Sequence, residues 1–173
     1  MSLAFEAMEF ALDAHKDQVR KYTGEPYWVH LAEVAGIVST ISWRVPDANP
    51  GLLVAVAWLH DVVEDCGVGP YELTERFGGD VRDGVLLLSD MEEGNRAARK
   101  AAARERLARA PWWVQTIKVA DLMSNTASIL LHDAAFAPVY RGEALALLDV
   151  MTAADERLVA MLRARLEPSY TQI

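Results

Sequence analysis

The chain contains a single cysteine, Cys66, among its 173 residues. An internal disulfide is therefore excluded, and so is a zinc site built from several thiolates. No uninterrupted apolar stretch reaches the roughly 18 residues that a membrane-spanning helix needs. The N-terminal segment has no basic stretch of the signal-peptide kind, and it carries Glu6 and Asp13 within its apolar pattern. We therefore expect a cytoplasmic protein that does not bind a membrane.

Positive charge is also in short supply. Seventeen Lys and Arg residues stand against twenty-five Asp and Glu residues, which gives a formal net charge of −8. The long-range field of such a protein repels phosphate backbones, so a nucleic-acid partner is not expected. A small phosphorylated substrate remains compatible with this charge, provided that basic side chains gather at one place.

No segment has a convincing strand pattern, whereas apolar residues recur at helical spacing along most of the chain. We predict an all-α fold of about eight helices in one domain that covers residues 1–173. The run Leu52–Leu59 is apolar nearly all round, which indicates a buried central helix. The last helix is expected to continue from about Arg141 to Leu166. Its predicted inner stripe consists of Leu147, Leu148, Met151, Leu158 and Met161.

Four groups of polar residues interrupt the apolar pattern: His30, His60-Asp61, Glu64-Asp65 and Asp121. Each has an ordinary structural interpretation when taken alone, such as a core histidine or a solvated turn. Taken together, the two histidines with Asp61 and Asp121 form a mixed nitrogen and oxygen ligand set that suits a divalent transition metal. Because Asp61 directly follows His60, both can reach one ion only where a helix ends. We expect Gly67 and Gly69, just beyond, to supply that break.

Asp121 lies within an apolar helical segment, where an isolated carboxylate would be too costly to bury. Asn125 follows it by four residues and Lys118 precedes it by one turn, so the three side chains share one helix face. Asp121 is therefore expected either to bind metal or to be paired. Lys118 has two interpretations of equal weight, namely a structural partner of Asp121 and a contact to a substrate phosphate.

Several motifs occur in a specific order that resembles the RelA/SpoT hydrolase domain, an HD-type phosphohydrolase. The resemblance runs from about residue 5 to about residue 130. It rests on Ala14-His15 with Gln18, Arg20-Lys21, Gly24, Pro26-Tyr27, His30, Val34-Ala35, the segment from Ala57 to Asp65, Glu72, Phe77-Gly78, Val81, Leu88-Ser89, and Lys118 to Asp121 with Asn125. The length of the chain leads us to expect a free-standing small alarmone hydrolase.

The resemblance implies a Mn²⁺ ion, or another divalent metal, held by two histidines and two aspartates. These ligands are His30, His60, Asp61 and Asp121. It implies that Glu64 and Asp65 organise and activate the attacking water, and that (p)ppGpp loses its 3′-pyrophosphate. It also places Arg20 and Lys21 beside the substrate and gives Asn125 a contact to the nucleoside.

The chain departs from the family pattern at three positions. Leu31 stands where the family usually has proline, and Leu122 and Ala127 stand where it commonly has basic residues. The nucleotide therefore stays open between (p)ppGpp and another phosphorylated nucleotide that resembles ppApp or NADPH. A nucleotide-binding sensor without catalysis is a further alternative function. The sequence also leaves a homodimer open.

A basic run follows the central motifs and consists of Arg96, Arg99, Lys100, Arg104 and Arg106. It is either a solvated helix face or a cationic rim that contacts a polyphosphate. The sequence leaves both interpretations open.

Overall fold

The computed structural model describes residues 2–42 and 50–167. Within these ranges the chain forms ten α-helices and no strand, which confirms the all-α prediction. The described residues divide into two compact units, Met1–Met91 and Glu92–Ile173. Each unit is described by itself below, and the prediction of a single domain over residues 1–173 stays a prediction.

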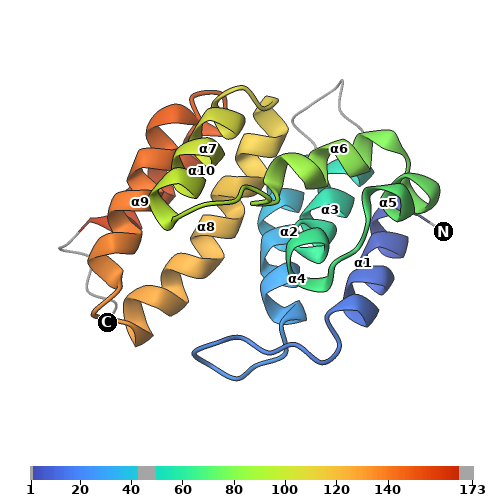
Figure 1. The fold of residues 1–173 in the computed structure, drawn as a ribbon, viewed down its shortest axis with the longest axis horizontal. Helices are drawn as coiled ribbons and strands as arrows, with labels where there is room; N and C mark the ends of the chain where they lie inside the picture. Colours follow the sequence, from blue (N-terminus) through green and yellow to red (C-terminus); the bar gives the residue numbers. More distant parts are fainter. Residues whose placement is uncertain (1, 43–49, 168–173) are drawn as a thin grey trace. The chain divides into compact units, whose positions relative to one another are not determined.

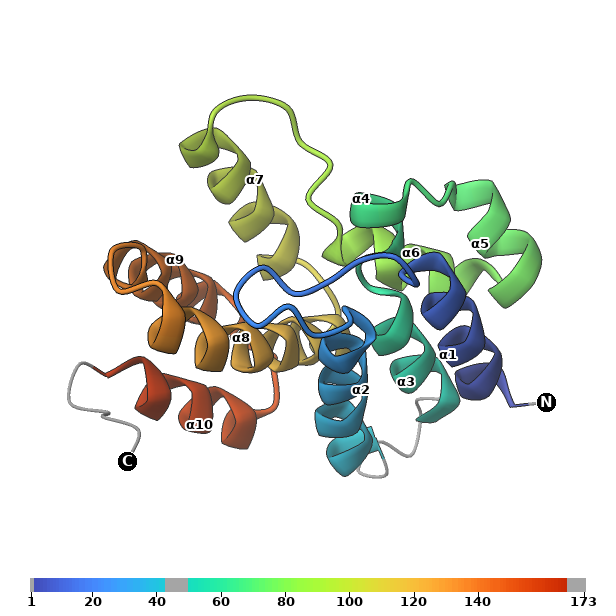
Figure 2. The same cartoon turned by 90° about the horizontal axis from the view of Figure 1, so that it is seen from below.

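Among the described residues, the first unit contains six helices, which can be followed in Figures 1 and 2. They are α1 (Leu3–Ala14), α2 (Trp28–Ser42), α3 (Pro50–Leu59), α4 (Val62–Cys66), α5 (Pro70–Phe77) and α6 (Gly79–Leu88). Helix α3 lies between α1 and α2 in both views, and it also packs against α6.

The burial of α3 confirms that Leu52–Leu59 is the central apolar segment. Leu53, Val56 and Leu59 are fully buried, and full burial of a side chain of this size stabilises a fold by roughly 1.5–3 kcal/mol. The facing side of α1 buries the small residues Ala7 and Ala11. Small side chains let the two packed helices approach closely.

The described part of the second unit, up to residue 167, contains four helices: α7 (Arg96–Ala108), α8 (Trp112–His132), α9 (Ala137–Val150) and α10 (Glu156–Leu166). Helix α8 is the longest of these and packs against each of the other three. It is buried along most of its length, from Val114 to Thr126. Long segments with this degree of burial hold their side chains in fixed positions, which suits a helix that carries polar residues of a site.

The prediction of one last helix from Arg141 to Leu166 is wrong, because α9 ends at Val150 and α10 begins at Glu156. The Asp155 side chain caps α10 by accepting hydrogen bonds from the backbone N–H groups of Arg157 and Leu158. Together with a short additional helix, α4, this division accounts for ten helices where about eight were expected.

The same division changes which residues of the last segment face inward. Leu147, Leu148, Met151 and Leu158 are buried as predicted, whereas Met161 is 49% exposed. The buried stripe of α10 instead consists of Leu158, Leu162 and Leu166, spaced four apart. A new helix starts with its own rotation about its axis, so the phase of the apolar pattern is not carried over from α9.

Gln115 fixes the turns that surround α8. Its side-chain amide donates to the carbonyl oxygens of Leu107 and Ala110, each at 3.0 Å, and its Oε1 accepts from the N–H of Ala153 at 2.9 Å. The side chain is only 1% exposed. One residue therefore joins the end of α7, the start of α8 and the turn before α10.

None of the described helices is both long and apolar enough to cross a membrane.

Candidate active site

The His60-Asp61 pair lies at the junction between α3 and α4. Helix α3 ends at Leu59 and α4 begins at Val62, so the helical path breaks at the pair itself. The expected break at Gly67 and Gly69 is therefore misplaced. Gly67 has a left-handed backbone (φ 69°) and ends the next helix instead. The early break is what allows two consecutive side chains to point toward one place.

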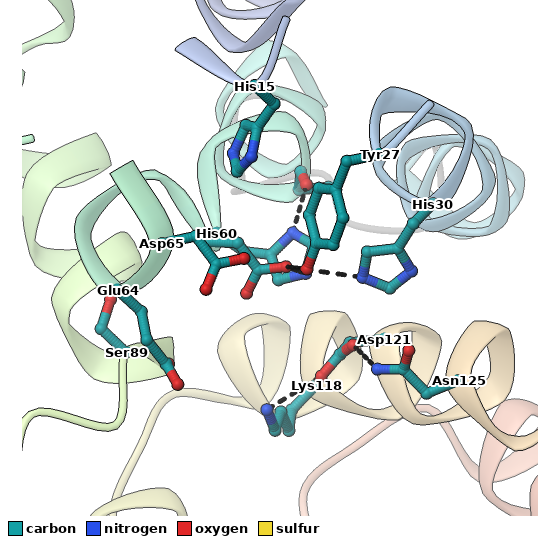
Figure 3. A network of polar contacts seen from close by, with 12 residues as sticks. His15, Tyr27, His30, His60, Glu64, Asp65, Ser89, Lys118, Asp121 and Asn125 are labelled. Carbon is teal, nitrogen blue, oxygen red and sulfur yellow. Dashed lines mark hydrogen bonds and ion pairs between the residues drawn. The ribbon is translucent and has the colours of Figure 1, made fainter. Parts of the chain in front are cut away.

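His30 lies in the first turn of α2 and meets this pair inside the first unit. The Nε2 atoms of His30 and His60 lie 3.5 Å and 3.0 Å from the same atom, Oδ2 of Asp61. Both imidazoles are buried, with 1% and 2% exposure, respectively, and their rings are 5.2 Å apart at an angle of 63° (Figure 3). The structure thus brings three of the four predicted metal ligands together.

The second nitrogen of His60 determines what the first one can bind. Nδ1 lies 2.8 Å from the carbonyl oxygen of Ala57, which only an N–H group can satisfy. A neutral His60 then presents the lone pair of Nε2 toward the carboxylate of Asp61. At 3.0 Å from the carboxylate oxygen, that nitrogen either shares a proton with Asp61 or leaves room for a metal ion between the two groups. A donor set of two imidazoles and a carboxylate, with this orientation, suits a divalent metal ion.

Glu64 and Asp65 follow on α4, and each carboxylate has a defined partner in the first unit. Glu64 Oε2 accepts a hydrogen bond of 3.0 Å from the backbone N–H of Asp90. Asp65 Oδ2 accepts one of 2.8 Å from the side-chain amide of Gln18. Both residues are solvent-exposed, in contrast to the histidines. They can therefore exchange protons with water while their orientation is maintained.

Arg20 and Lys21 lie in the connection between α1 and α2, as the glycine and proline of this stretch predicted. The connection is pinned by an isolated bridge between Val19 and Pro26, and Gly24 turns it with a φ of 71°. Lys21 is exposed, whereas Arg20 is half-buried. The Nζ atom of Lys21 lies 3.3 Å from the hydroxyl of Tyr22. Their predicted contact with substrate stays a prediction.

The remaining predicted site residues belong to the second unit and share one face of α8. Asp121 is 5% exposed, and its two oxygens are both engaged: Lys118 Nζ lies 2.8 Å from Oδ2, and Asn125 Nδ2 donates to Oδ1 at 2.6 Å (Figure 3). The expectation that a buried Asp121 is paired or bound is thus met by pairing. Lys118 is a structural partner of Asp121 in this unit, and its contact with a phosphate stays a prediction.

Three residues that the sequence did not single out as site residues support the first unit's cluster. Gln18 binds Asp65, Tyr27 donates to Asp61, and His15 binds Gln18. His15 packs in the interior, with 1% exposure. The only sequence signal for these three was their place in the family-like stretch before His30.

Cys66 ends α4 and lies beside this support. Its Sγ is 3.4 Å from the carbonyl oxygen of Ala14 and 3.4 Å from Nδ1 of His15. Burial raises the pKa of the Cys66 thiol, and the negative charges of Asp65 and Asp61 raise it further. A thiol in this environment stays protonated and is a poor nucleophile.

Two cations of the basic run have partners within the second unit. Arg96 forms a bidentate ion pair with Glu143, with both bonds at 2.7 Å, and its guanidinium lies 5.0 Å from the ring centroid of Phe136. Arg106 is paired with Glu92. Both cations therefore neutralise carboxylates of their own unit, and a contact between the basic run and a polyphosphate stays a prediction.

Comparisons with known proteins agree with this geometry. The family described as HD domain matches residues 7–133, which include every predicted site residue. The chain is 39% identical over 87 positions to a GTP pyrophosphokinase from Myxococcus xanthus. The aligned stretch covers 49% of this chain and 11% of that protein. The chain is also 32% identical over 125 positions to the guanosine-3′,5′-bis(diphosphate) 3′-pyrophosphohydrolase MESH1 from Xenopus tropicalis. The aligned stretch covers 72% of this chain and 68% of that protein.

The fold is also found among solved structures. A metazoan orthologue of SpoT that hydrolyses ppGpp superposes with a TM-score of 0.84 and 23% identity, over 95% of this chain and 94% of that one. At this level of identity the likeness concerns the fold. The match over residues 7–133, together with the clustered His30, His60 and Asp61, shows that the chain belongs to the HD domain family.

Proposed function

We propose that this protein is a metal-dependent phosphohydrolase that removes the 3′-pyrophosphate from (p)ppGpp or a closely related alarmone. One observation carries the proposal: the buried Nε2 atoms of His30 and His60 converge on Asp61. It occurs in a chain that is similar over 72% of its length to a 3′-pyrophosphohydrolase of this nucleotide.

The proposed metal is Mn²⁺, with His30, His60, Asp61 and Asp121 as ligands. The first three are neighbours in the first unit, and Asp121 is the buried carboxylate of the second. Because the family match runs through both units, we propose that they work as one domain. When bound, the metal would lower the pKa of a water molecule and polarise a phosphoryl oxygen.

The chain's own carboxylates supply the proton chemistry of the proposal. Glu64 and Asp65 are adjacent in sequence to the histidine-aspartate pair, exposed to solvent, and held by Asp90 and Gln18. A carboxylate oriented in this way can accept a proton from the attacking water or direct its lone pair at phosphorus. The P–O bond to the 3′-oxygen then breaks, which leaves GDP with a free 3′-hydroxyl and pyrophosphate when ppGpp is the substrate.

Four polar residues are proposed to bind the nucleotide: Arg20, Lys21, Lys118 and Asn125. Arg20 and Lys21 lie in an exposed connection, where a planar guanidinium can stack on a base and an ammonium can meet phosphate. Lys118 and Asn125 are held by Asp121. If Asp121 binds a metal, these two groups become available to a substrate.

A second nucleotide class is supported by the departures from the family pattern. Leu122 is buried in α8 and Ala127 is exposed on the same helix, at positions where the family commonly has basic residues. Fewer cations near Asn125 change how the site would recognise the phosphates or the base of a nucleotide. An adenine alarmone or a dinucleotide phosphate is therefore the alternative substrate.

The single cysteine, with its protonated thiol, fits a reducing cytoplasm.

The experiment that tests the proposal compares ppGpp, ppApp and NADPH as substrates of the Mn²⁺-loaded protein, with products resolved by ion-exchange chromatography. Asp61→Asn, which removes a charge at the proposed metal ligand, is the negative variant. GDP and pyrophosphate from ppGpp, lost in Asp61→Asn, would support the proposal. Cleavage of another nucleotide alone would retain the hydrolase and replace its substrate. Binding of nucleotide and metal without cleavage would favour the sensor.

A further inference from the structure

The aromatic rings around the proposed metal ligands form a series in the first unit (Figure 3). His15 stacks on Tyr27 with ring centroids 4.9 Å apart and an interplanar angle of 18°. Tyr27 in turn meets the edge of His30 at 5.5 Å and 65°, and His30 meets His60 at 5.2 Å and 63°. Tyr27 is thus held between a buried histidine that is not a proposed ligand and one that is.

The hydroxyl of Tyr27 reaches the third proposed ligand. It donates a hydrogen bond of 2.7 Å to Oδ2 of Asp61. This is the same carboxylate oxygen that faces the Nε2 atoms of His30 and His60. A carboxylate that accepts a hydrogen bond from a fixed donor loses rotational freedom, which lowers the entropic cost of binding an ion.

The position of the Tyr27 ring is itself determined by a hydrogen-bond chain. The amide nitrogen of Gln18 donates to Asp65 at 2.8 Å, so its Oε1 is left as an acceptor. Nδ1 of His15 lies 2.6 Å from that oxygen and must therefore carry the hydrogen. His15 is thereby fixed in one tautomer and one orientation, and it provides a rigid face on which Tyr27 stacks.

We propose that Tyr27 is a positioning residue that presets Asp61 for metal binding, with His15 as the support of its ring. The inference rests on the proposed function, because it assigns Tyr27 a role toward the ligand set His30, His60 and Asp61. Loss of the hydrogen bond to a ligand typically weakens metal affinity by about 10- to 100-fold. Tyr27 acts through Asp61 and takes no part in proton transfer.

The test is a calorimetric titration of metal-stripped protein with Mn²⁺, for the wild type and Tyr27→Phe. The variant removes one oxygen and retains the ring stack. We expect its Mn²⁺ affinity to fall about 10- to 100-fold. Its hydrolysis rate should return close to the wild-type value once Mn²⁺ is saturating. Tyr71→Phe is the matched control, because Tyr71 is 77% exposed and lies on α5.

A second variant guards against an effect on folding. Replacement of Tyr27 by p-aminophenylalanine keeps a donor at the same position and should restore affinity to near that of the wild type. Unchanged affinity in Tyr27→Phe, with a wild type that binds Mn²⁺, would overturn the positioning role alone. So would a weakened affinity that the amino analogue does not restore. A wild type that binds no divalent metal would overturn both this inference and the proposed function.

Discussion

Replacement of Gln115 by methionine is expected to destabilise the second unit strongly, although the two side chains have nearly the same volume. The side chain makes three hydrogen bonds to backbone groups at 2.9–3.0 Å and is 1% exposed. Each such bond contributes about 1 kcal/mol net, and leaving a buried partner unsatisfied costs more. Leu107 O keeps a bond from the N–H of Ala110, and methionine adds some apolar burial, which offsets part of the loss.

The expected net loss is therefore about 2 to 4 kcal/mol in the free energy of unfolding. Urea unfolding followed by circular dichroism measures it directly. In thermal unfolding, a chain of this size should show a decrease in Tm of about 5 to 15 °C. Glu105→Met on the exposed face of α7 is the control and should change stability by no more than about 0.5 kcal/mol. A Gln115→Met protein within that same margin would refute the role of Gln115 as the junction of three segments.

Three further predictions concern the first unit. Glu64→Gln should bind Mn²⁺ as the wild type does while its turnover falls by about 10²- to 10⁴-fold, measured by calorimetry and product release; full activity would remove its role in activating water. Arg20→Ala should raise KM for the nucleotide and leave Mn²⁺ affinity unchanged, and identical kinetics would contradict its contact with substrate. Because burial and nearby carboxylates raise the pKa of Cys66, its alkylation by iodoacetamide should be slower than that of a small-molecule thiol at pH 8 and should still increase at higher pH. A rate equal to that of the small thiol would show that the thiol is not perturbed.

The sequence predicted best where one strong pattern decided the outcome. The segment Leu52–Leu59 is apolar on all sides, and only a central position can bury it, so its fully buried place in α3 was predictable. The two histidines and Asp61 were predictable as a group because their residue types share one chemistry. The position of the helix break at His60 was not, since glycine is the usual signal and neither His60 nor Asp61 is a glycine.

The support of the site could not be predicted from local patterns. Gln18 and Asp65 are 47 positions apart, and Tyr27 and Asp61 are 34 apart. Contacts over such separations depend on how α1, α2 and α4 pack, which no local periodicity encodes. The division between α9 and α10 was missed for a related reason. The alanines of the turn favour a helix, whereas the turn is held by bonds from Gln115 and Thr116 on another helix.

The metal dependence of catalysis is the property on which the proposed function stands or falls. Protein stripped of metal by chelation would be assayed with ppGpp, then resupplied with Mn²⁺ and assayed again in the same buffer. We expect no GDP or pyrophosphate from the stripped protein and release of both in equal amounts after Mn²⁺ is added. Equal rates of hydrolysis before and after metal removal would contradict a reaction that depends on His30, His60 and Asp61 as metal ligands.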